Sequence, residues 1–272
     1  MSEYRLSEIN IYPVKSLGGI SLTSAEVEKR GLKYDRRFLL VDEENMFLTQ
    51  RVYPAMALLK TSLSDSGIEI NDIRNNEKII IPFKPEAADL DAAEVTIWND
   101  TVRALHVSGD FDKWFSDALK TKCRLVYMPD DSKRLVDKEY AKDNEIVSFS
   151  DGFPFLIIGQ ESLNYLNSKL LTEKLPMNRF RPNFVFTGGL PHDEDIWNKF
   201  MIGSITFRAV KPCARCIITT VNQLTAEKGK EPLRTMAEYR TIDNKVLFGQ
   251  NLLQEAEGTV SVGDELKIIS LK

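Results

Sequence analysis

Short runs in which apolar and polar residues alternate fill the first hundred positions of the chain, and turn-forming residues separate them. Alternation with a period of two is typical of a strand that buries one face. Gly18-Gly19 and 64–67 are among the turns, at spacings usual for packed antiparallel sheets. We therefore expect a barrel or sandwich here, with strands at 9–14, 21–27, 38–41, 56–62, 78–82 and 94–98.

Helical spacing of apolar residues is confined to a few segments. It begins at Phe111 and at Leu163, and a short helix at 232–239 has Pro232 at an early helical position. The polar run 129–144 has little periodicity, and we interpret it as a linker or mobile loop. The predicted fold class is thus mixed α+β and predominantly β. Further strands are expected at 123–127, 155–158, 184–187, 204–210, 216–221 and 265–271.

Composition narrows the class of protein. The 272 residues are 43% apolar and 28% charged, which is enough for a sizeable core in one large or two moderate domains. A net charge of -4 gives no global attraction to phosphate backbones, so we expect no nucleic-acid partner. With three cysteines, no signal peptide and no apolar stretch of roughly 20 residues, we expect a cytoplasmic protein with no membrane partner.

The segment 211–220 carries the most distinctive chemistry. It sets Cys213 and Cys216 beside Lys211 and Arg215, just before an apolar, β-branched run. A neighbouring cation stabilises the thiolate, which is both the nucleophile and the soft-metal ligand. The Cys-x-x-Cys spacing alone leaves open a structural zinc site, a thioredoxin-like dithiol or two thiols that simply pack in a core. The first two are weakly supported, because no second ligand pair exists and a strand is expected where a helix should begin.

Basic residues also recur where strands meet turns, at Lys15-Ser16, Arg36-Arg37, Arg179 and Arg181. Pro182 should force Arg181 into an extended conformation, and a guanidinium fixed in this way suits phosphate binding. Each of these residues could equally be a solvated surface charge. The chain has neither a Gly-rich phosphate loop nor a Gly-x-Ser-x-Gly elbow, and a triad based on its two histidines is unsupported.

Several ordered motifs together resemble the MOSC superfamily of molybdenum-cofactor-binding proteins. Its N-terminal β-barrel domain is matched by 11–16, 30–32, 34–38 and 48–51, and the MOSC domain proper by 180–183, 194–197, 211–220, 230–235 and 248–251. The resemblance implies a MOSC N-terminal β-barrel-like domain at 1–128, packed on a MOSC β-barrel with peripheral helices at 129–272. Within the superfamily, the chain is most similar to the mitochondrial amidoxime-reducing component and its bacterial relatives.

The resemblance also implies roles for individual residues. Cys216 would be the catalytic residue and the ligand of the metal in a molybdenum–molybdopterin cofactor, with Arg215 and the backbone of Ala214 lining the pterin site. Cys213 would not be a ligand, and pyridoxal phosphate is not expected. The remaining cofactor contacts would fall on Lys15, Ser16, Arg36, Arg181, Asn183 and Asn251.

The implied activity is the reduction of amidoximes, hydroxylamines and N-hydroxylated bases. Since three cysteines cannot hold a four-thiolate cluster, electrons would come from a separate ferredoxin, flavodoxin or reductase. The alternative is a molybdenum-cofactor carrier or sulfur-transfer module that uses a Cys216 persulfide. Phe153 stands where mitochondrial members have a small polar cofactor contact, and we expect no counterpart of their membrane anchor. Substrate-facing walls are expected in the loops 129–144 and 188–197.

Overall fold

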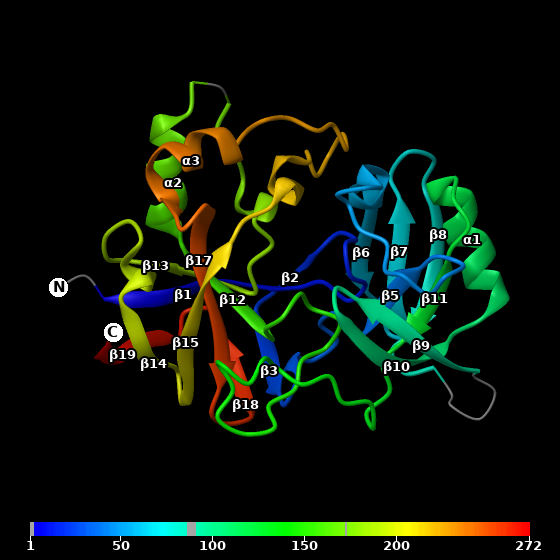
Figure 1. The fold of residues 1–272 in the computed structure, drawn as a ribbon, viewed down its shortest axis with the longest axis horizontal. Helices are drawn as coiled ribbons and strands as arrows, with labels where there is room; N and C mark the ends of the chain where they lie inside the picture. Colours follow the sequence, from blue (N-terminus) through cyan, green and yellow to red (C-terminus); the bar gives the residue numbers. More distant parts are fainter. Residues whose placement is uncertain (1–2, 86–90, 172) are drawn as a thin grey trace.

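A computed structural model describes residues 3–85, 91–171 and 173–272 of the chain. It forms two lobes that lie side by side (Figure 1). In one lobe, the helices α2 (Gln160–Lys169) and α3 (Leu233–Arg240) lie beside a large sheet, and in the other, α1 (Gly109–Leu119) packs on smaller sheets. Within the described ranges, no helix is long and apolar enough to cross a membrane.

The large sheet closes on itself as a barrel, because its first and seventh strands also pair with each other. Its neighbours are antiparallel except for one parallel pair, β12 with β13. Closure leaves no free sheet edge in the ring. Around the ring the strands are β12 (Phe155–Gly159), β13 (Phe184–Thr187), β1 (Tyr4–Ile11), β19 (Glu265–Leu271), β14 (Trp197–Ile202), β15 (Ile205–Ala214) and β17 (Lys245–Gln254), with β2 (Ile20–Leu22) and β16 (Thr241–Ile242) flanking it.

Aromatic side chains fill the interior of the barrel. Phe155 stacks on Phe184, and the ring of Phe207 packs edge-on against both, with centroids 5.4 and 5.5 Å away. Trp197 and Phe200 extend this cluster, and all five side chains are buried. Phe184 and Phe186 alternate with Val185, which packs outside this cluster, as the sequence pattern predicts. On β14, a register shift lets Trp197 and Phe200 join the same cluster although they are three positions apart.

The other lobe is built from short antiparallel sheets and one helix. The helix α1 begins after Ser108, whose Oγ accepts a hydrogen bond from the amide of Phe111, and Asp110 and Asp112 in its first turn suit the helix dipole. Phe115 on this helix joins Phe38 in the core. The sheets are β5 (Phe38–Val41), β11 (Arg124–Tyr127), β10 (Asp100–His106) and β9 (Ala92–Ile97); and β6 (Leu59–Leu63), β7 (Gly67–Asp72) and β8 (Glu77–Pro82).

The first strands of the chain belong physically to the lobe formed by its second half. β1 lies in the barrel between β13 and β19, and β3 (Ser24–Glu28) pairs with β18 (Gly258–Ser261) and β4 (Gly31–Leu32). The chain therefore crosses between the lobes after about residue 32 and returns later. The predicted division at 128/129 stays a prediction, while the predicted fold class, mixed α+β and predominantly β, is confirmed.

The segment 129–144, interpreted as a linker or mobile loop, is packed into the fold. Although it forms no regular strand, it contains the buried residues Ser132, Arg134 and Val136. The guanidinium of Arg134 donates hydrogen bonds to the carbonyls of Ser148 and Asp151, at 3.1 and 2.8 Å. A polar segment can thus be tied to the fold by one buried, multiply bonded guanidinium, which an analysis of apolar periodicity does not detect.

Candidate functional site

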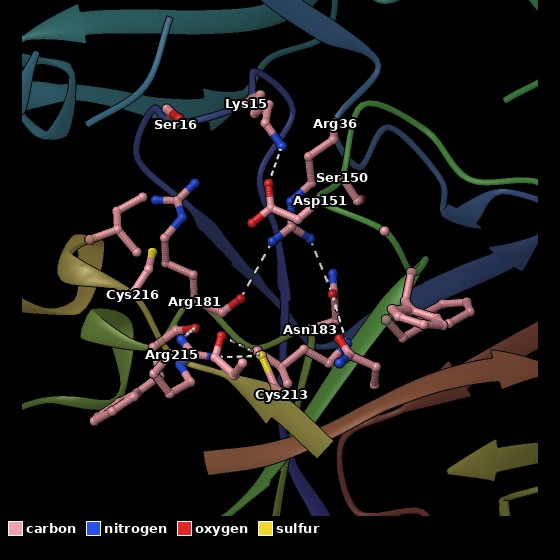
Figure 2. Close-up of a pocket in the computed structure, with 18 of the residues that line it drawn as sticks. Lys15, Ser16, Arg36, Ser150, Asp151, Arg181, Asn183, Cys213, Arg215 and Cys216 are labelled. Atoms are coloured by element: carbon pink, nitrogen blue, oxygen red, sulfur yellow. Dashed lines mark hydrogen bonds and ion pairs between the residues drawn. The ribbon is translucent and has the colours of Figure 1, made fainter. Parts of the chain in front are cut away.

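A pocket of about 830 Å³, measured out to its open mouth, lies where the two lobes meet. The predicted site residues all contribute to its lining, although they come from segments more than 200 positions apart (Figure 2). They are Lys15, Ser16, Arg36, Arg181, Asn183, Ala214, Arg215, Cys216 and Asn251.

Two of the cations in the pocket share one aromatic ring. The guanidinium carbons of Arg36 and Arg181 lie 4.3 and 4.2 Å from the ring centroid of Tyr12. Burial raises the pKa of Tyr12 to about 12, and its hydroxyl donates to the carbonyl of Pro182. Burial also lowers the pKa of Arg181 to about 10, which still leaves it charged near pH 7. The ring therefore holds two like charges in the same small region through cation–π contacts.

Hydrogen bonds fix the orientation of these guanidiniums. Arg36 donates to the carboxylate of Asp35 at 2.5 Å and to Oδ1 of Asn183 at 3.1 Å, and Arg181 donates to the carbonyl of Leu17 at 2.7 Å. Asp35 is buried, and burial raises its pKa, while the charge and hydrogen bond of Arg36 oppose this. Because these donors are already held in place, they lose little conformational entropy when they bind an anion.

The backbone is strained at three of the predicted positions. Ser16, Arg36 and Arg181 have φ values of 69°, 49° and 55°, in the left-handed region that non-glycine residues rarely adopt. The expectation that Pro182 holds Arg181 in an extended conformation is therefore wrong. The buried contacts of Arg181 with Tyr12 and Leu17 outweigh the local preference. Such strain costs on the order of 1–3 kcal/mol per residue and clusters at functional sites.

Lys15 lies between β1 and β2 and also lines the pocket (Figure 2). Its ammonium donates to the carbonyl of Phe149 at 2.8 Å and to Oδ1 of Asp151 at 2.6 Å. Burial lowers the pKa of Lys15 to about 8, and the charges of Arg134 and Arg36 act in the same direction, while Asp151 opposes them. A further negative charge that binds beside Lys15 would therefore raise its pKa and stabilise its protonated form.

The cysteine loop follows the last paired residue of β15. Cys216 lines the pocket as a free, partly exposed thiol, and its carbonyl accepts hydrogen bonds from the amide and Oγ1 of Thr219. The predicted strand at 216–221 is wrong, because the chain turns here into the 3₁₀-helix η5 (Ile217–Thr220). On the adjacent strand, the side-chain amide of Asn251 donates to the carbonyl of Lys211 and so ties the two strands together at the pocket.

The expected cation beside Cys216 contacts the other thiol. Nη1 of Arg215 lies 3.0 Å from Sγ of Cys213, while Nη2 donates to the carbonyl of Phe180 at 2.5 Å (Figure 2). Lys211 also points elsewhere, with its ammonium 4.4 Å from the ring centroid of Tyr140. The sequence places Lys211 and Arg215 beside the Cys216 thiolate. In the structure Arg215 contacts Cys213 and Lys211 contacts Tyr140, so this pairing is wrong.

Some pocket residues were not predicted. Asp151, Thr49 and Arg51 line it, and the guanidinium carbon of Arg51 lies 4.0 Å from the ring centroid of Trp98. The motif 48–51 was part of the resemblance and could have flagged Thr49 and Arg51, but no sequence pattern brings Trp98 and Asp151 together. The expectation that 129–144 and 188–197 form the pocket walls is wrong, because neither segment contributes to its lining.

A protein-only metal site finds no support. In the part of the chain that the structure describes, no group of three or more His, Cys, Asp or Glu side chains is arranged to hold a metal. The zinc alternative thus lacks a ligand set. The thiol of Cys216, in a pocket that several cations also line, instead suits a metal that arrives with its own anionic chelate.

Comparison with known proteins identifies the family. The model of the MOSC N-terminal beta barrel domain matches residues 3–122, and that of the MOSC domain matches residues 144–267. Mitochondrial amidoxime-reducing component 1 of Mus musculus is 31% identical over 288 residues, which cover 97% of this chain and 82% of that protein. The chain belongs to the MOSC-domain proteins.

Other relatives of this MOSC-domain protein fall into two kinds. Mitochondrial amidoxime-reducing component 1 of Homo sapiens is 30% identical over 97% of this chain and 82% of its own length. Molybdenum cofactor sulfurase of Oryza sativa subsp. japonica is 31% identical over 98% of this chain, but only 35% of its own length is covered. The MOSC-domain protein thus corresponds to about a third of the plant sulfurase and to most of the amidoxime-reducing component.

Proposed function

We propose that this MOSC-domain protein binds a molybdenum–pterin cofactor in the pocket between its lobes and reduces N-hydroxylated compounds. The observation that carries the proposal is the combination in one pocket of a free thiol, Cys216, with the cations Lys15, Arg36 and Arg181. Relatives of similar length are named amidoxime-reducing components, which supports the choice of reaction.

The residues present fit such a cofactor. Lys15, Arg36 and Arg181 offer N–H donors to a phosphate, and the left-handed turn at Ser16 brings that residue into the lining. Arg215, the backbone of Ala214 and Asn251 would line the pterin, and Asn183 would orient Arg36. Cys216 would give the metal a soft thiolate ligand.

When bound, the cofactor would supply two electrons to an N–O bond, and the protein would do the remaining work. The overall reaction consumes two electrons and two protons, breaks the N–O bond and releases an amine or amidine together with water. The protein would hold the cofactor by its phosphate and pterin and align the substrate at the pocket mouth. Electrons would come from a separate donor protein such as a ferredoxin, flavodoxin or reductase, and a reducing compartment such as the cytoplasm would keep the thiols free.

The test is expression in a host that makes the cofactor, followed by metal and pterin analysis and turnover of benzamidoxime with reduced methyl viologen. We expect near-stoichiometric molybdenum in the wild type, formation of benzamidine, and loss of both in Cys216→Ala. A protein that binds no molybdenum in such a host would contradict the proposal.

A second candidate is a cofactor carrier or sulfur-transfer module in which Cys216 bears a persulfide. The plant sulfurase relative favours it, as does the presence of two thiols, Cys213 and Cys216, in the same pocket. A carrier would bind the cofactor and pass it or its sulfur to an acceptor enzyme, yet would reduce no N-hydroxylated substrate even with an artificial donor. Turnover therefore separates the two candidates.

A further inference from the structure

Three consecutive carbonyls of the turn 14–18 are each bound by a side chain from a distant part of the sequence. They are the carbonyls of Ser16, Leu17 and Gly18, which accept hydrogen bonds from Gln50, Arg181 and Thr61 at 2.6, 2.7 and 2.9 Å. Arg181 lines the pocket, whereas Gln50 and Thr61, among the described residues, do not. The carbonyl side of the turn is thus fixed by the protein itself.

Ser16 lies in this turn with a left-handed backbone and carries two donors, its amide and its hydroxyl. The amides of Lys15, Leu17 and Gly18 each donate to a backbone carbonyl. Within the described ranges, the amide and the hydroxyl of Ser16 form no hydrogen bond, although Ser16 is 5% exposed and lines the pocket (Figure 2). Buried polar groups are nearly always bonded, and an amide beside a left-handed residue is common in backbone anion sites. Both donors therefore suit an anion in the pocket.

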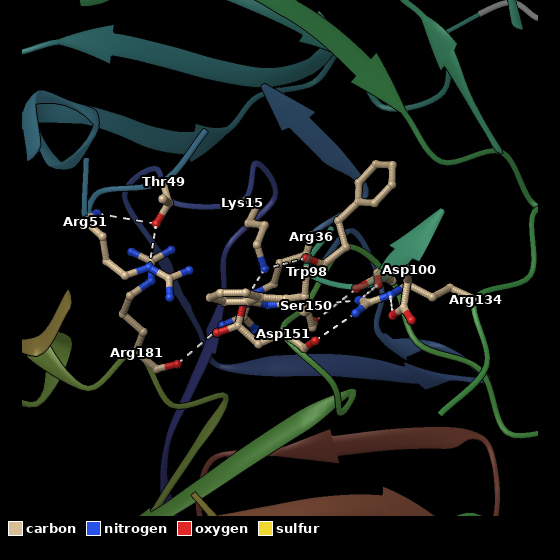
Figure 3. A network of polar contacts seen from close by, with 12 residues as sticks. Lys15, Arg36, Thr49, Arg51, Trp98, Asp100, Arg134, Ser150, Asp151 and Arg181 are labelled. Atoms are coloured by element: carbon tan, nitrogen blue, oxygen red, sulfur yellow. Dashed lines mark hydrogen bonds and ion pairs between the residues drawn. The ribbon is translucent and has the colours of Figure 1, made fainter. Parts of the chain in front are cut away.

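Gln50 holds the turn from outside the pocket. Its neighbours Thr49 and Arg51 do line the pocket, and Oγ1 of Thr49 accepts hydrogen bonds from the amide and Nε of Arg51 at 3.4 and 3.3 Å (Figure 3). Gln50 itself is 0% exposed. Its route to a ligand is the carbonyl of Ser16.

The side-chain amide of Gln50 is held in turn by Gln223, 173 positions further along the chain. Nε2 of Gln223 donates to Oε1 of Gln50 at 3.0 Å, and Nε2 of Gln50 donates back to Oε1 of Gln223 at 3.4 Å. Nε2 of Gln223 also donates to the carbonyl of Val221 at 3.1 Å, and Lys60 donates to the carbonyl of Gln223. Gln50 lies between β5 and β6, whereas Gln223 lies between η5 and α3, so the pair joins the two lobes.

A reciprocal pair of buried amides favours one geometry. Breaking either bond would leave a buried donor or acceptor without a partner, which costs more than the bond itself contributes. The left-handed conformation of Ser16 is unfavourable for a residue other than glycine, and such conformations persist where the surroundings impose them. Gln50, fixed by Gln223, is one of the groups that impose it.

We propose that Gln50 and Gln223 are positioning residues, whose paired amides hold Ser16 in the conformation that directs its amide and hydroxyl to a bound phosphate. This deepens the proposed function and rests on its anion site, but it requires neither the metal nor the reduction. It also makes anion binding depend on a contact between the lobes. Inorganic phosphate is the probe for the phosphate of the cofactor.

The experiment measures phosphate binding to the full-length, cofactor-free protein by calorimetry at pH 7. Gln50→Met cannot donate to Ser16 and should bind phosphate about tenfold more weakly, the loss expected for one misplaced hydrogen bond to a charged group. Gln223→Met keeps that bond but frees Gln50, and should weaken binding about threefold.

Gln254→Met is the matched control. It removes an amide that donates to the carbonyls of Glu28 and Lys29 at 2.8 and 2.9 Å, which is the same kind of contact as that of Gln50 with Ser16 but lies away from the pocket. The control should bind phosphate as wild type does. A tenfold loss in the control as well would show that any such substitution disturbs the site, and would overturn the proposal.

A purely structural role for the pair predicts a different pattern. It would lower the free energy of unfolding in urea and leave the phosphate affinity of the folded variants unchanged, and that result would overturn the proposal. Action through Ser16 further predicts that Gln50→Met weakens phosphate less in a Ser16→Ala background than in wild type, because the two changes affect the same contact. Strictly additive losses would assign Gln50 another route and contradict the role.

Two further results keep the test decisive. If Gln50→Met does not fold, unchanged phosphate affinity in Gln223→Met contradicts the role of the pair. A protein that shows the expected differences in phosphate affinity but takes up no molybdenum would leave the positioning role standing and the proposed function wrong. A protein that takes up molybdenum, yet binds phosphate equally in wild type and Gln50→Met, would leave the function standing and the positioning role wrong.

Discussion

The guanidinium of Arg215 donates a hydrogen bond to Sγ of Cys213 at 3.0 Å, although Cys216 is its neighbour in sequence. Both thiols line the same pocket, and the second Arg215 nitrogen is held by the carbonyl of Phe180. The two cysteines of the motif therefore stand in different environments: one is already paired with a cation inside the protein, and the other is free to meet a ligand.

This difference predicts unequal effects of the two Cys→Ser substitutions. Cys216→Ser should lose the molybdenum, because a hydroxyl is a poor ligand for a soft metal site. Cys213→Ser should retain most of the metal and lose less than about tenfold in kcat/KM, the lower end of what groups around a metal ligand contribute. Elemental analysis and benzamidoxime turnover of both variants test this, and equal loss of metal in the two would contradict a single-ligand site.

The ring of Tyr12 between Arg36 and Arg181 predicts a graded effect on stability. Tyr12→Leu removes both cation–π contacts and leaves two guanidiniums facing each other, so the free energy of unfolding should fall by about 2–4 kcal/mol. Tyr12→Phe keeps the ring and loses only the hydrogen bond to Pro182, which costs about 1 kcal/mol. Urea unfolding of cofactor-free protein measures both, and equal losses would mean that the hydroxyl, not the ring, matters.

Four strands of the barrel, β12, β13, β15 and β19, could be predicted from their residue pattern, whereas β1 was predicted only in part and β14 and β17 were not predicted. The 3₁₀-helix at 217–220 could not be predicted. Its β-branched residues favour a strand, but the ladder with β17 ends at Ala214 opposite Leu247, and Thr219 satisfies the carbonyl of Cys216 instead. Side-chain-to-backbone hydrogen bonds of this kind compete with a sheet and are invisible to periodicity.

Site residues that belong to family motifs could be predicted from the sequence. Site residues that only the tertiary structure brings together could not. Lys15 and Arg181 fall in such motifs and do line the pocket. Asp151 and Trp98 lie in separate loops, and their contact exists only because Arg134 and the two lobes bring those loops together. The conformation of Arg181 was predicted wrongly for the same reason, since its buried contacts override the local effect of the following proline.

The lowered pKa of Lys15, about 8, predicts that anion binding takes up a proton in alkaline solution. At pH 9 about a tenth of Lys15 is protonated in the cofactor-free protein, and a bound phosphate beside it should raise the pKa again. Calorimetry with inorganic phosphate in buffers of different ionisation enthalpy should therefore show uptake of close to one proton at pH 9. At pH 7 the uptake should vanish, because Lys15 already carries its proton there.

The control for this measurement is Lys15→Met, which cannot take up the proton. It should bind phosphate more weakly at pH 7 and show no proton uptake at pH 9. Uptake that persists in the variant would assign the proton to another group near the anion.

Glu194 is a buried acid that lies apart from the chemistry of the pocket. It is fully covered by protein, and its carboxylate accepts hydrogen bonds from the amide of Gly159 at 3.2 Å and from Oγ of Ser162 at 3.0 Å, at the start of α2. Burial raises its pKa from 4.5 to about 7, although these hydrogen bonds oppose the shift. Glu194 thus accepts hydrogen bonds at the start of α2, while its burial makes its own ionisation less favourable.

A pH-dependent cost of folding follows from this shift. Between pH 4.5 and about 7 the folded protein keeps a proton on Glu194 that the unfolded chain has released, so stability falls as the pH rises through this window. Relative to Glu194→Gln, which cannot ionise, wild type should lose about 3 kcal/mol between pH 4.5 and pH 8. Urea unfolding of both proteins at the two pH values measures this difference, with pH 4.5 as the reference at which the folded protein holds Glu194 protonated. A constant difference between the two proteins would mean that Glu194 ionises freely in the folded state, and its hydrogen bonds with Gly159 and Ser162 would then have to outweigh its burial.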